Sequence, residues 1–334
     1  EHGDLTADLY VDCTGFKSLL LGGALQVPYI SYKDMLINNG TWATKIPYVN
    51  PNAEMNLTTN GTAINNGWVW NIPLWSRIGS GYVYSKNFID KDDALIEFQK
   101  HIGHGDELDY HHIDIKNGRH ETCWRKNCLA IGLSYGFIEP LESTGLLFAH
   151  EGVDKLVMAL ESRDRHITQL DRDCVNREMQ IHIDGVKYFV GFHFYGSVRD
   201  DTEYWRWYTQ ELKMGKHWND PHGVPLAGHR KDATMGLSRA RFNSFESGGF
   251  SDGIACVMAG HHINFYTDAI REKITQWTPT RRKHLPYLST ASHDYFKGYM
   301  KDVFDYWDTR TKKINKLADQ SPTQYEYLKE NIYA

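Results

Sequence analysis

The first third of the chain has the hydrophobic and polar pattern of a sheet of short strands. An apolar run from Ala7 to Asp12 is typical of a buried strand, and a polar turn containing glycine follows it. The segments 41–48, 68–72 and 81–85 are rich in β-branched and aromatic residues, and polar loops separate them. We therefore expect these three segments to form neighbouring antiparallel strands.

The next segment, 90–102, has the pattern of an amphipathic helix, and its acidic start suits the positive end of the helix dipole. The candidates for its buried face are Leu95, Ile96 and Phe98. Further along, the dipeptide Asn117-Gly118 is a strong signal for a tight turn. It predicts a β-hairpin between the segments 112–115 and 119–124.

A strand, a loop and a helix are predicted to follow one another in the middle of the chain. The apolar run 128–132 is typical of a central strand, and it leads into the loop 136–145. After Gly145 the apolar residues recur at helical spacing, and we expect Ser143 or Thr144 to cap the helix. The positions expected to face the core are Leu146, Val153, Leu156, Val157 and Leu160.

Together these elements predict a mixed α+β fold. The rest of the chain contains helical patterns, such as 292–307, between glycine-bearing loops, and we find no internal repeat or clear linker. We expect residues 1–160 to contain the sheet and the chemistry, and residues 161–334 to form a mainly helical part that covers a substrate.

Composition and charge narrow the class of protein. A chain of 334 residues with 41% hydrophobic content can bury a large core. The net charge of -5 comes from interspersed signs, so nucleic acid is not an expected partner. No segment predicts a membrane span or a signal peptide, which favours a cytoplasmic protein. Histidines gather between 101 and 120 without the spacing of metal ligands, so we expect no metal site.

The loop Gly136-Phe-Ile-Glu-Pro-Leu-Glu-Ser-Thr-Gly145 carries the most informative chemistry. A loop that turns into a capped helix brings unpaired backbone N–H groups and the positive dipole end to one point, which suits an anion. Thr144 and Gly145 supply such amides. Glu139 and Glu142 lie in the same loop, although a polar surface loop can carry carboxylates without any catalytic role.

With three other segments, this loop resembles the flavin-dependent halogenases of the tryptophan halogenase family. Residues 67–73 resemble the family's Trp-x-Trp-x-Ile-Pro signature, which falls on Trp68, Trp70, Ile72 and Pro73. Residues 199–206 are similar to its Arg-x-Asp-Thr-x-Phe-Trp-Arg stretch, with Tyr204 in place of phenylalanine. Residues 8–18 are similar to a segment of its flavin-binding region, and all four matches follow the family's order.

The resemblance implies a flavin-monooxygenase-like FAD domain and a specific reaction. Reduced FAD, made by a separate flavin reductase, and oxygen would convert chloride, bromide or iodide into hypohalous acid, which halogenates a small, electron-rich aromatic substrate such as an indole or phenol. Glu142 would orient the halogenating species or take up the proton that the ring loses, with Ser143 positioning it. The backbone N–H groups of Thr144 and Gly145 would hold the halide.

The resemblance also implies the surroundings of the flavin. The residues expected to bind or wall it are Asp12, Gly15, Phe137, Pro140 and Leu146. Trp68 and Trp70 would keep the site from acting as an ordinary monooxygenase, although two tryptophans on one strand face are also typical of a core.

The sequence departs from the family pattern at its beginning. It shows no Gly-x-Gly-x-x-Gly dinucleotide fingerprint and no segment like the region of the catalytic lysine, so we expect a carboxy-terminal larger part that does not bind FAD tightly by itself. Two alternatives stay open, a flavin-dependent aromatic monooxygenase and a non-catalytic relative that binds aromatic molecules. A homodimer is common among related enzymes, but no sequence feature demonstrates one.

Overall fold

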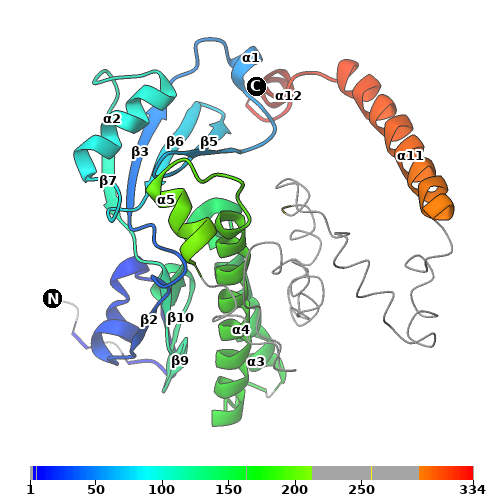
Figure 1. The fold of residues 1–334 in the computed structure, drawn as a ribbon. Coiled ribbons are helices and arrows are strands. Elements are labelled where there is room, and N and C mark those ends of the chain that lie inside the picture. The colour runs from blue at the N-terminus through cyan, green and yellow to red at the C-terminus, as the bar shows by residue number, and fades with distance from the viewer. Residues whose placement is uncertain (1–2, 5, 163, 213–256, 258–292, 334) are drawn as a thin grey trace. The chain divides into compact units, whose positions relative to one another are not determined.

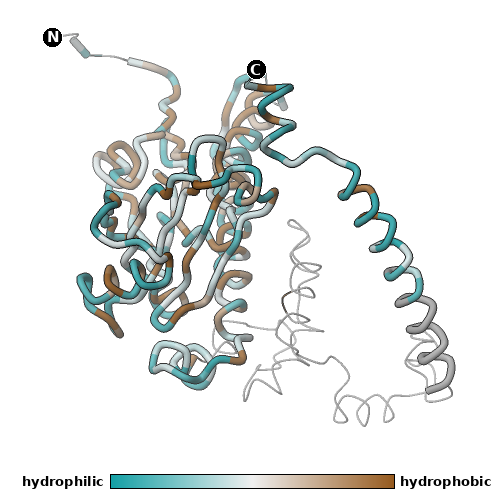
Figure 2. The backbone as a smooth tube through the Cα atoms, turned by 90° about the horizontal axis from the view of Figure 1, so that it is seen from above, coloured by the Kyte–Doolittle hydropathy of each residue, from teal (hydrophilic) through white to brown (hydrophobic). Residues whose placement is uncertain are grey.

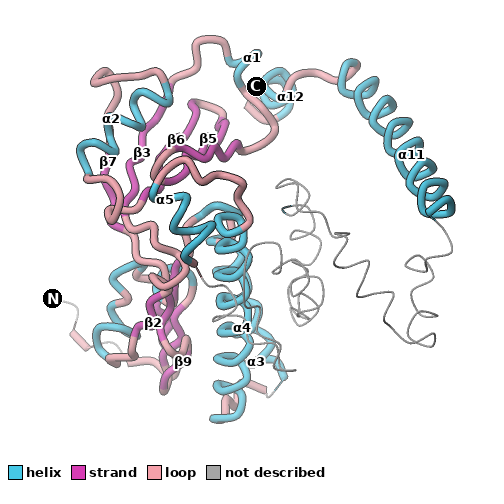
Figure 3. Tube along the Cα trace, in the orientation of Figure 1, coloured by secondary structure: helices cyan, strands magenta, loops and turns pink. Residues whose placement is uncertain are grey.

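The computed structural model describes residues 3–4, 6–162, 164–212, 257 and 293–333, which belong to two compact units (Figure 1). The first unit consists of residues 1–46, 60–71 and 79–263. The second unit consists of residues 47–59, 72–78 and 264–334. Helices and sheets are mixed, as the predicted α+β class requires (Figure 3). The predicted division into a part that holds the flavin and a part that covers the substrate concerns bound ligands and stays a prediction.

The largest sheet has five strands in the order β4-β5-β6-β3-β7. These strands are β3 (Gly40–Ile46), β4 (Asn60–Ile64), β5 (Gly67–Leu74), β6 (Arg77–Tyr84) and β7 (His111–Asp114). The three segments expected to be neighbouring strands are therefore confirmed as β3, β5 and β6. Helix α2 (Lys91–Ile102) lies against β3, and Asp90 caps its first turn. The core between them consists of Trp42, Val69, Tyr82, Tyr84, Ala94 and Phe98.

The predicted buried face of α2 is correct at Phe98 and wrong at Ile96, whose side chain is 61% exposed. Ala94, four residues before Phe98, takes the inward position instead. A small residue next to the sheet lets the helix approach closely, which the pattern of large apolar residues does not reveal.

Two three-stranded sheets complete the first unit. In one, β1 (Tyr10–Asp12) runs parallel to the central strand β10 (Cys128–Ala130), and β9 (Trp124–Arg125) is antiparallel to β10. In the other, β8 (Gly118–His120) lies between β11 (Gly136–Phe137) and β2 (Tyr29–Ser31), and both pairs are antiparallel. The predicted central strand before the loop is confirmed as β10.

The predicted hairpin at Asn117-Gly118 is wrong, because β7 pairs with β3 and β8 pairs with strands of a different sheet. Asn117 is buried, and its side chain donates to the carbonyl oxygen of Asn38 and accepts from the N–H of Glu139. Gly118 has φ +153°, and a Cβ there would lie 2.4 Å from the carbonyl oxygen of Ile30. The dipeptide thus forms a tight crossing between two sheets.

Helices α3 (Gly145–Ser162) and α4 (Gln169–Tyr195) pack against one another beside the small sheets. Thr168 caps α4 in a reciprocal arrangement with Asp171. Ion pairs between Glu151 and His182 (2.7 Å) and between Lys155 and Glu178 (2.6 Å) join the two helices. Short 3-10 helices lie at Gly15–Lys17, Gly132–Ser134 and Pro140–Glu142, and π-helical turns lie at Leu19–Ala24 and Trp207–Glu211.

The predicted inner face of α3 is wrong at Leu146, Val153 and Val157, which are exposed. Small residues make the close contact instead. A Cβ at Gly152 would lie 3.0 Å from the Ile131 side chain, so the helix backbone meets the end of β10 directly. The apolar pattern therefore identified the helix but not the side by which it packs.

The second unit is built around the indole of Trp75. Tyr325 and Tyr333 both stack against this ring, with centroid distances of 5.1 and 4.6 Å and interplanar angles of 15° and 16°. Tyr325 lies in α12 (Gln324–Asn331), which contacts α1 (Pro51–Glu54). The stack therefore fixes the last helix to the segment around Trp75.

Helix α11 (His293–Asp319) confirms the helix predicted for 292–307 and continues it by three turns. Residues 308–319 are all exposed, and Figure 2 shows this part of the helix in mainly hydrophilic colours. Within the described ranges, no helix is both long and apolar enough to cross a bilayer.

A buried ion pair fixes α4 to β8. The guanidinium of Arg119 donates to both carboxylate oxygens of Asp184, through Nε at 2.8 Å and Nη2 at 2.9 Å. Its remaining Nη1 donates to the carbonyl oxygens of His120 and Glu121. Tyr32 donates a further hydrogen bond to the same carboxylate. The forked geometry satisfies a cation that is almost fully buried.

We expect Arg119→Met to lower the free energy of unfolding by about 3 kcal/mol, because it leaves a carboxylate and two carbonyl groups without their donor. Arg125→Met is the matched control, since Arg125 is exposed, and it should change stability by less than about 0.5 kcal/mol. Urea unfolding of the two variants measures the difference. Equal midpoints would contradict the structural role of the pair.

Candidate functional site

The loop between β11 and α3 has the strand–loop–helix form that the sequence predicts. After β11 the chain is buried at Ile138 and Glu139, turns through Pro140–Glu142, and enters α3 at Gly145. Ser143 has φ +56°, a left-handed conformation that is uncommon for serine, and its N–H donates to the carbonyl oxygen of Pro140. Such backbone strain is typical of functional turns.

Glu142 projects from this loop towards α4, where its carboxyl group contacts the imidazole of His193. The distance from Glu142 Oε1 to His193 Nε2 is 2.6 Å, and the other ring nitrogen lies 2.9 Å from the carbonyl oxygen of Phe189. Because a carbonyl oxygen can only accept, His193 Nδ1 must carry a proton. Sequence analysis could not reveal this contact, since no short-range spacing links residues 142 and 193.

The start of α3 offers backbone N–H groups. No hydrogen bond is recorded for the amide nitrogens of Thr144 and Gly145 within the described part of the chain. The hydroxyl of Thr144 is buried and also has no partner there, so the expected side-chain cap by Thr144 is not formed. This end of an 18-residue helix therefore has donors available for an anion.

Glu139, on the same loop, is fully buried. Its Oε2 accepts from the amide of Asn38 at 2.7 Å and from the indole N–H of Trp68 at 2.8 Å. Burial raises the pKa of this carboxyl to about 7, although those two hydrogen bonds lower it in part. Sequence analysis gave Glu139 no role of its own, because nothing in the sequence reveals that its side chain is buried.

Asp12 shapes the turn after β1. Its carboxylate accepts from the backbone and hydroxyl of Thr14 through one oxygen, and from the N–H groups of Leu20 and Leu21 through the other. Burial alone would raise the pKa of Asp12, but these hydrogen bonds lower it below its ordinary value. Gly15 has φ +69° in this turn, as a glycine readily can.

Apolar side chains lie exposed beside this turn, on the first compact unit. The rings of Phe16 and Phe137 meet edge to face at 5.1 Å. Phe16 is exposed, Phe137 is half-buried, and Pro140 and Leu146 are exposed. Partly exposed aromatic rings next to a glycine turn fit one face of a flat ligand, so Phe16 and Phe137 are compatible with a flavin. Among the described residues, no cluster of histidine, cysteine, aspartate and glutamate could hold a metal ion.

The two tryptophans of the Trp-x-Trp-x-Ile-Pro segment lie on β5, with ring centroids 5.9 Å apart. Trp68 is buried and Trp70 half-buried. A Cβ at position 81 on the neighbouring β6 would lie 2.1 Å from the Trp70 ring, so Gly81 makes room for it. Ile72 and Pro73 continue β5 and belong to the second unit.

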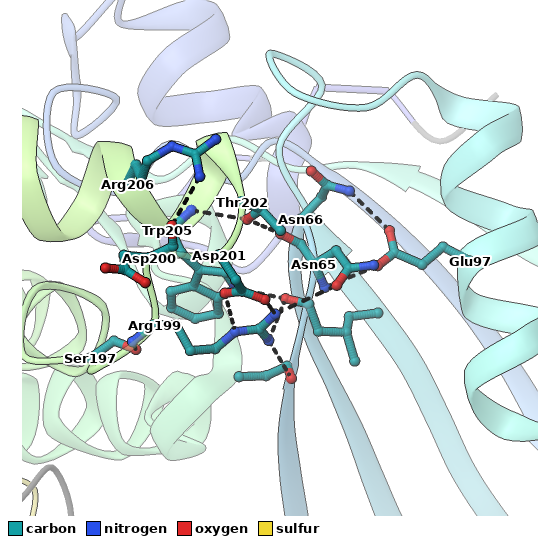
Figure 4. Close-up of polar contacts among 12 residues, drawn as sticks. Asn65, Asn66, Glu97, Ser197, Arg199, Asp200, Asp201, Thr202, Trp205 and Arg206 are labelled. Atoms are coloured by element: carbon teal, nitrogen blue, oxygen red, sulfur yellow. Dashed lines mark hydrogen bonds and ion pairs between the residues drawn. The ribbon is translucent and has the colours of Figure 1, made fainter.

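The segment 199–206 grips the turn between β4 and β5, as Figure 4 shows. Arg199 Nη1 donates to the carbonyl oxygens of Ala63 (2.8 Å) and Ile64 (3.0 Å). Asp201 accepts from the same guanidinium. The Thr202 hydroxyl and the Trp205 indole donate to the carbonyl oxygens of Asn65 and Ile64. Arg199 Nη2 makes a longer contact of 3.5 Å with the side-chain oxygen of Asn65.

Thr202 also caps α5 (Glu203–Arg206), as predicted. Tyr204, which replaces the family's phenylalanine, is fully buried with Tyr208 beside it. The motif therefore has a structural role in this chain, because it positions the strand that carries Trp68.

Comparison with known proteins agrees with this geometry. A family model described as tryptophan halogenase matches residues 1–221. The 7-chloro-L-tryptophan 6-halogenase KtzR of Kutzneria sp. (strain 744) is 40% identical over 207 residues, which cover 62% of this chain and 40% of that protein. The tryptophan 7-halogenase RebH of Lentzea aerocolonigenes is 30% identical over 334 residues, 97% of this chain and 58% of that protein.

Two solved structures are similar over nearly the whole chain. One, described as the VirX1 apo structure, has a TM-score of 0.82 at 38% identity and covers 100% of this chain and 60% of that one. A tryptophan halogenase from Shewanella frigidimarina NCIMB 400 has a TM-score of 0.75 at 26% identity, covering 99% and 57%. The chain belongs to the tryptophan halogenase family. It spans 40% and 58% of the length of the two curated relatives above.

We expect Arg199→Lys to speed hydrogen exchange in the peptide covering 60–71 by about tenfold, because lysine cannot reproduce the forked contacts worth about 1.4 kcal/mol. Arg206→Lys is the control, since Arg206 makes one contact, to the carbonyl oxygen of Asp200. Mass spectrometry of exchanged peptides compares the two. Unchanged exchange in Arg199→Lys would show that the grip is not needed.

Proposed function

We propose that this chain forms the halide and flavin side of a flavin-dependent halogenase that acts on a small, electron-rich aromatic substrate such as an indole or a phenol. The observation that carries the proposal is the loop 139–145. It holds a carboxyl group that His193 fixes in place, followed by helix-start amides that have no partner among the described residues. The similarity to proteins named tryptophan halogenases supports it.

Glu142 is the group proposed to act on the reacting ring. His193 holds Oε1, which leaves Oε2 to accept a hydrogen bond or the proton that the ring loses when it regains aromaticity. This contact also fixes the rotamer, so the carboxylate needs little reorganisation. Ser143, in its left-handed conformation, sets the direction in which Glu142 and the following amides point.

The amides of Thr144 and Gly145 are proposed to bind chloride, bromide or iodide at the positive end of α3. Phe137, Pro140 and Leu146 are proposed to contact the flavin ring, and the Asp12 turn with Gly15 to approach the cofactor. When bound, reduced FAD with oxygen supplies the oxidant that makes the halide electrophilic. Trp68 and Trp70 are proposed to exclude direct oxygen insertion. A flavin reductase in the cytoplasm is the proposed source of reduced FAD.

The test uses the full-length protein with FAD, a flavin reductase, oxygen and bromide or chloride, offered to a panel of indoles and phenols. Mass spectrometry should detect a halogenated product that requires the halide. Hydroxylated products that form without halide would instead show a monooxygenase. No product from any substrate, with reduced flavin confirmed, would favour a non-catalytic protein that binds aromatic molecules.

In the same assay, we expect Glu142→Gln to lower the rate of halogenation by about 10²–10⁴-fold, since an amide cannot take up the proton. Glu121→Gln, at an exposed carboxylate on the same unit, is the matched control and should keep the wild-type rate. His193→Gln should give a smaller loss than Glu142→Gln, because the carboxylate stays while its orientation is no longer fixed. Full activity in Glu142→Gln would contradict the proposal that Glu142 takes up the proton from the substrate ring.

A further inference from the structure

The carboxyl group of Glu139 is bonded on one side only. Oε2 accepts from two N–H groups, whereas Oε1 is buried and has no hydrogen-bond partner among the described residues. Among the other buried oxygens of the first unit that have no partner in the described residues are Asn38 Oδ1 and the hydroxyl of Tyr204. Glu139 and Asn38 both affect the pKa of Tyr204, so these groups face one another.

No cation balances this carboxyl within the described residues, where no ion pair includes Glu139. The titratable groups that face it are the phenols of Tyr204 and Tyr208, and burial raises the pKa of each well above its ordinary value. Among the described residues, the groups that form hydrogen bonds with Glu139 are the side-chain amides of Asn38 and Asn117 and the Trp68 indole. An ionised carboxylate would leave a buried charge on Oε1, which accepts no hydrogen bond from the described residues. A proton on Oε1 removes that charge and lets this oxygen donate.

We propose that Glu139 is a positioning residue that works as a neutral acid, holding the Trp68 indole and the loop 139–145 in the arrangement that binds the halide. The proposal rests on the halide site proposed above. Its Oε2 joins the loop to β5 and to Asn38, and its backbone N–H joins the loop to Asn117. Loss of the proton would place an unpaired negative charge on the loop that must receive an anion.

The sign of the effect follows from the raised pKa. With a value of about 7, the neutral form predominates at lower pH, and the carboxyl becomes ionised as the pH rises through that value. Halide binding should therefore be tightest below neutral pH and weaken above it. If only the neutral form binds, the dissociation constant rises by about tenfold per pH unit well above the pKa.

Chloride is the probe, and the line width of its NMR signal in the presence of the full-length protein reports binding. Wild-type affinity should fall with pH, whereas Glu139→Gln, which mimics the neutral acid, should bind chloride with the low-pH affinity throughout. Glu121→Gln should follow the wild type. A pH dependence in Glu139→Gln equal to that of the wild type would overturn the proposal, because His193 and Glu142 remain in that variant.

A second readout does not depend on halide. The indole N–H resonance of Trp68, assigned with Trp68→Phe, should move with pH near neutrality in the wild type and stay constant in Glu139→Gln. If chloride does not bind at all, the halide site is wrong, and this resonance alone decides the state of Glu139. If Glu139→Gln does not fold, the wild-type titration decides it, and a resonance that is constant from about pH 5.5 to 8.5 would overturn the proposal.

Discussion

The side chain of Asn117 is the constraint on which the candidate site depends. This buried amide donates to the carbonyl oxygen of Asn38 and accepts from the N–H of Glu139, while the backbone carbonyl oxygen of Asn117 accepts from the backbone N–H of Tyr32. Three segments far apart in sequence thus share one residue. Since a buried amide that loses a partner costs about 1–3 kcal/mol, these segments are held in one arrangement. The loop that carries Glu142 begins from that fixed point.

Two carboxylates three residues apart on this loop have different environments. Glu142 reaches an imidazole and is partly open to water, whereas Glu139 is sealed among an indole and an amide. The different surroundings give the two carboxyl groups different affinities for a proton, as in other sites where one carboxyl group acts as the base and another as the acid. Glu142 is suited to accept a proton, and Glu139 is suited to keep one.

Local signals in the sequence predicted much of the fold. The strands β3, β5 and β6, the helix α2 with its acidic start, and the unit of β10, loop and α3 all follow from short-range patterns. The hairpin predicted at Asn117-Gly118 was wrong, because a dipeptide that is typical of turns can also occur where the chain passes, buried, from one sheet to another. The inner face of α3 was missed since Gly152 contributes no hydrophobicity, only close approach.

The site was predictable to the extent that it lies on one loop. Glu142, Ser143, Thr144 and Gly145 stand together in the sequence, and the family resemblance identified them. His193 could not be found in that way, because it reaches Glu142 from another helix. The partners of Glu139 are likewise distant in sequence, so its burial and its raised pKa appear only in the folded chain.

The grip of segment 199–206 on the turn between β4 and β5 has an evolutionary consequence. Its principal contacts with that turn, from Arg199, Thr202 and Trp205, end on main-chain oxygens. Every residue type offers such an oxygen, so these contacts place no demand on which side chains occupy the turn. Apart from Asn65, whose side-chain oxygen lies 3.5 Å from Arg199 Nη2, residues there are free, as far as this grip is concerned, to diverge between relatives or to be randomised in a library. The gripping residues must stay.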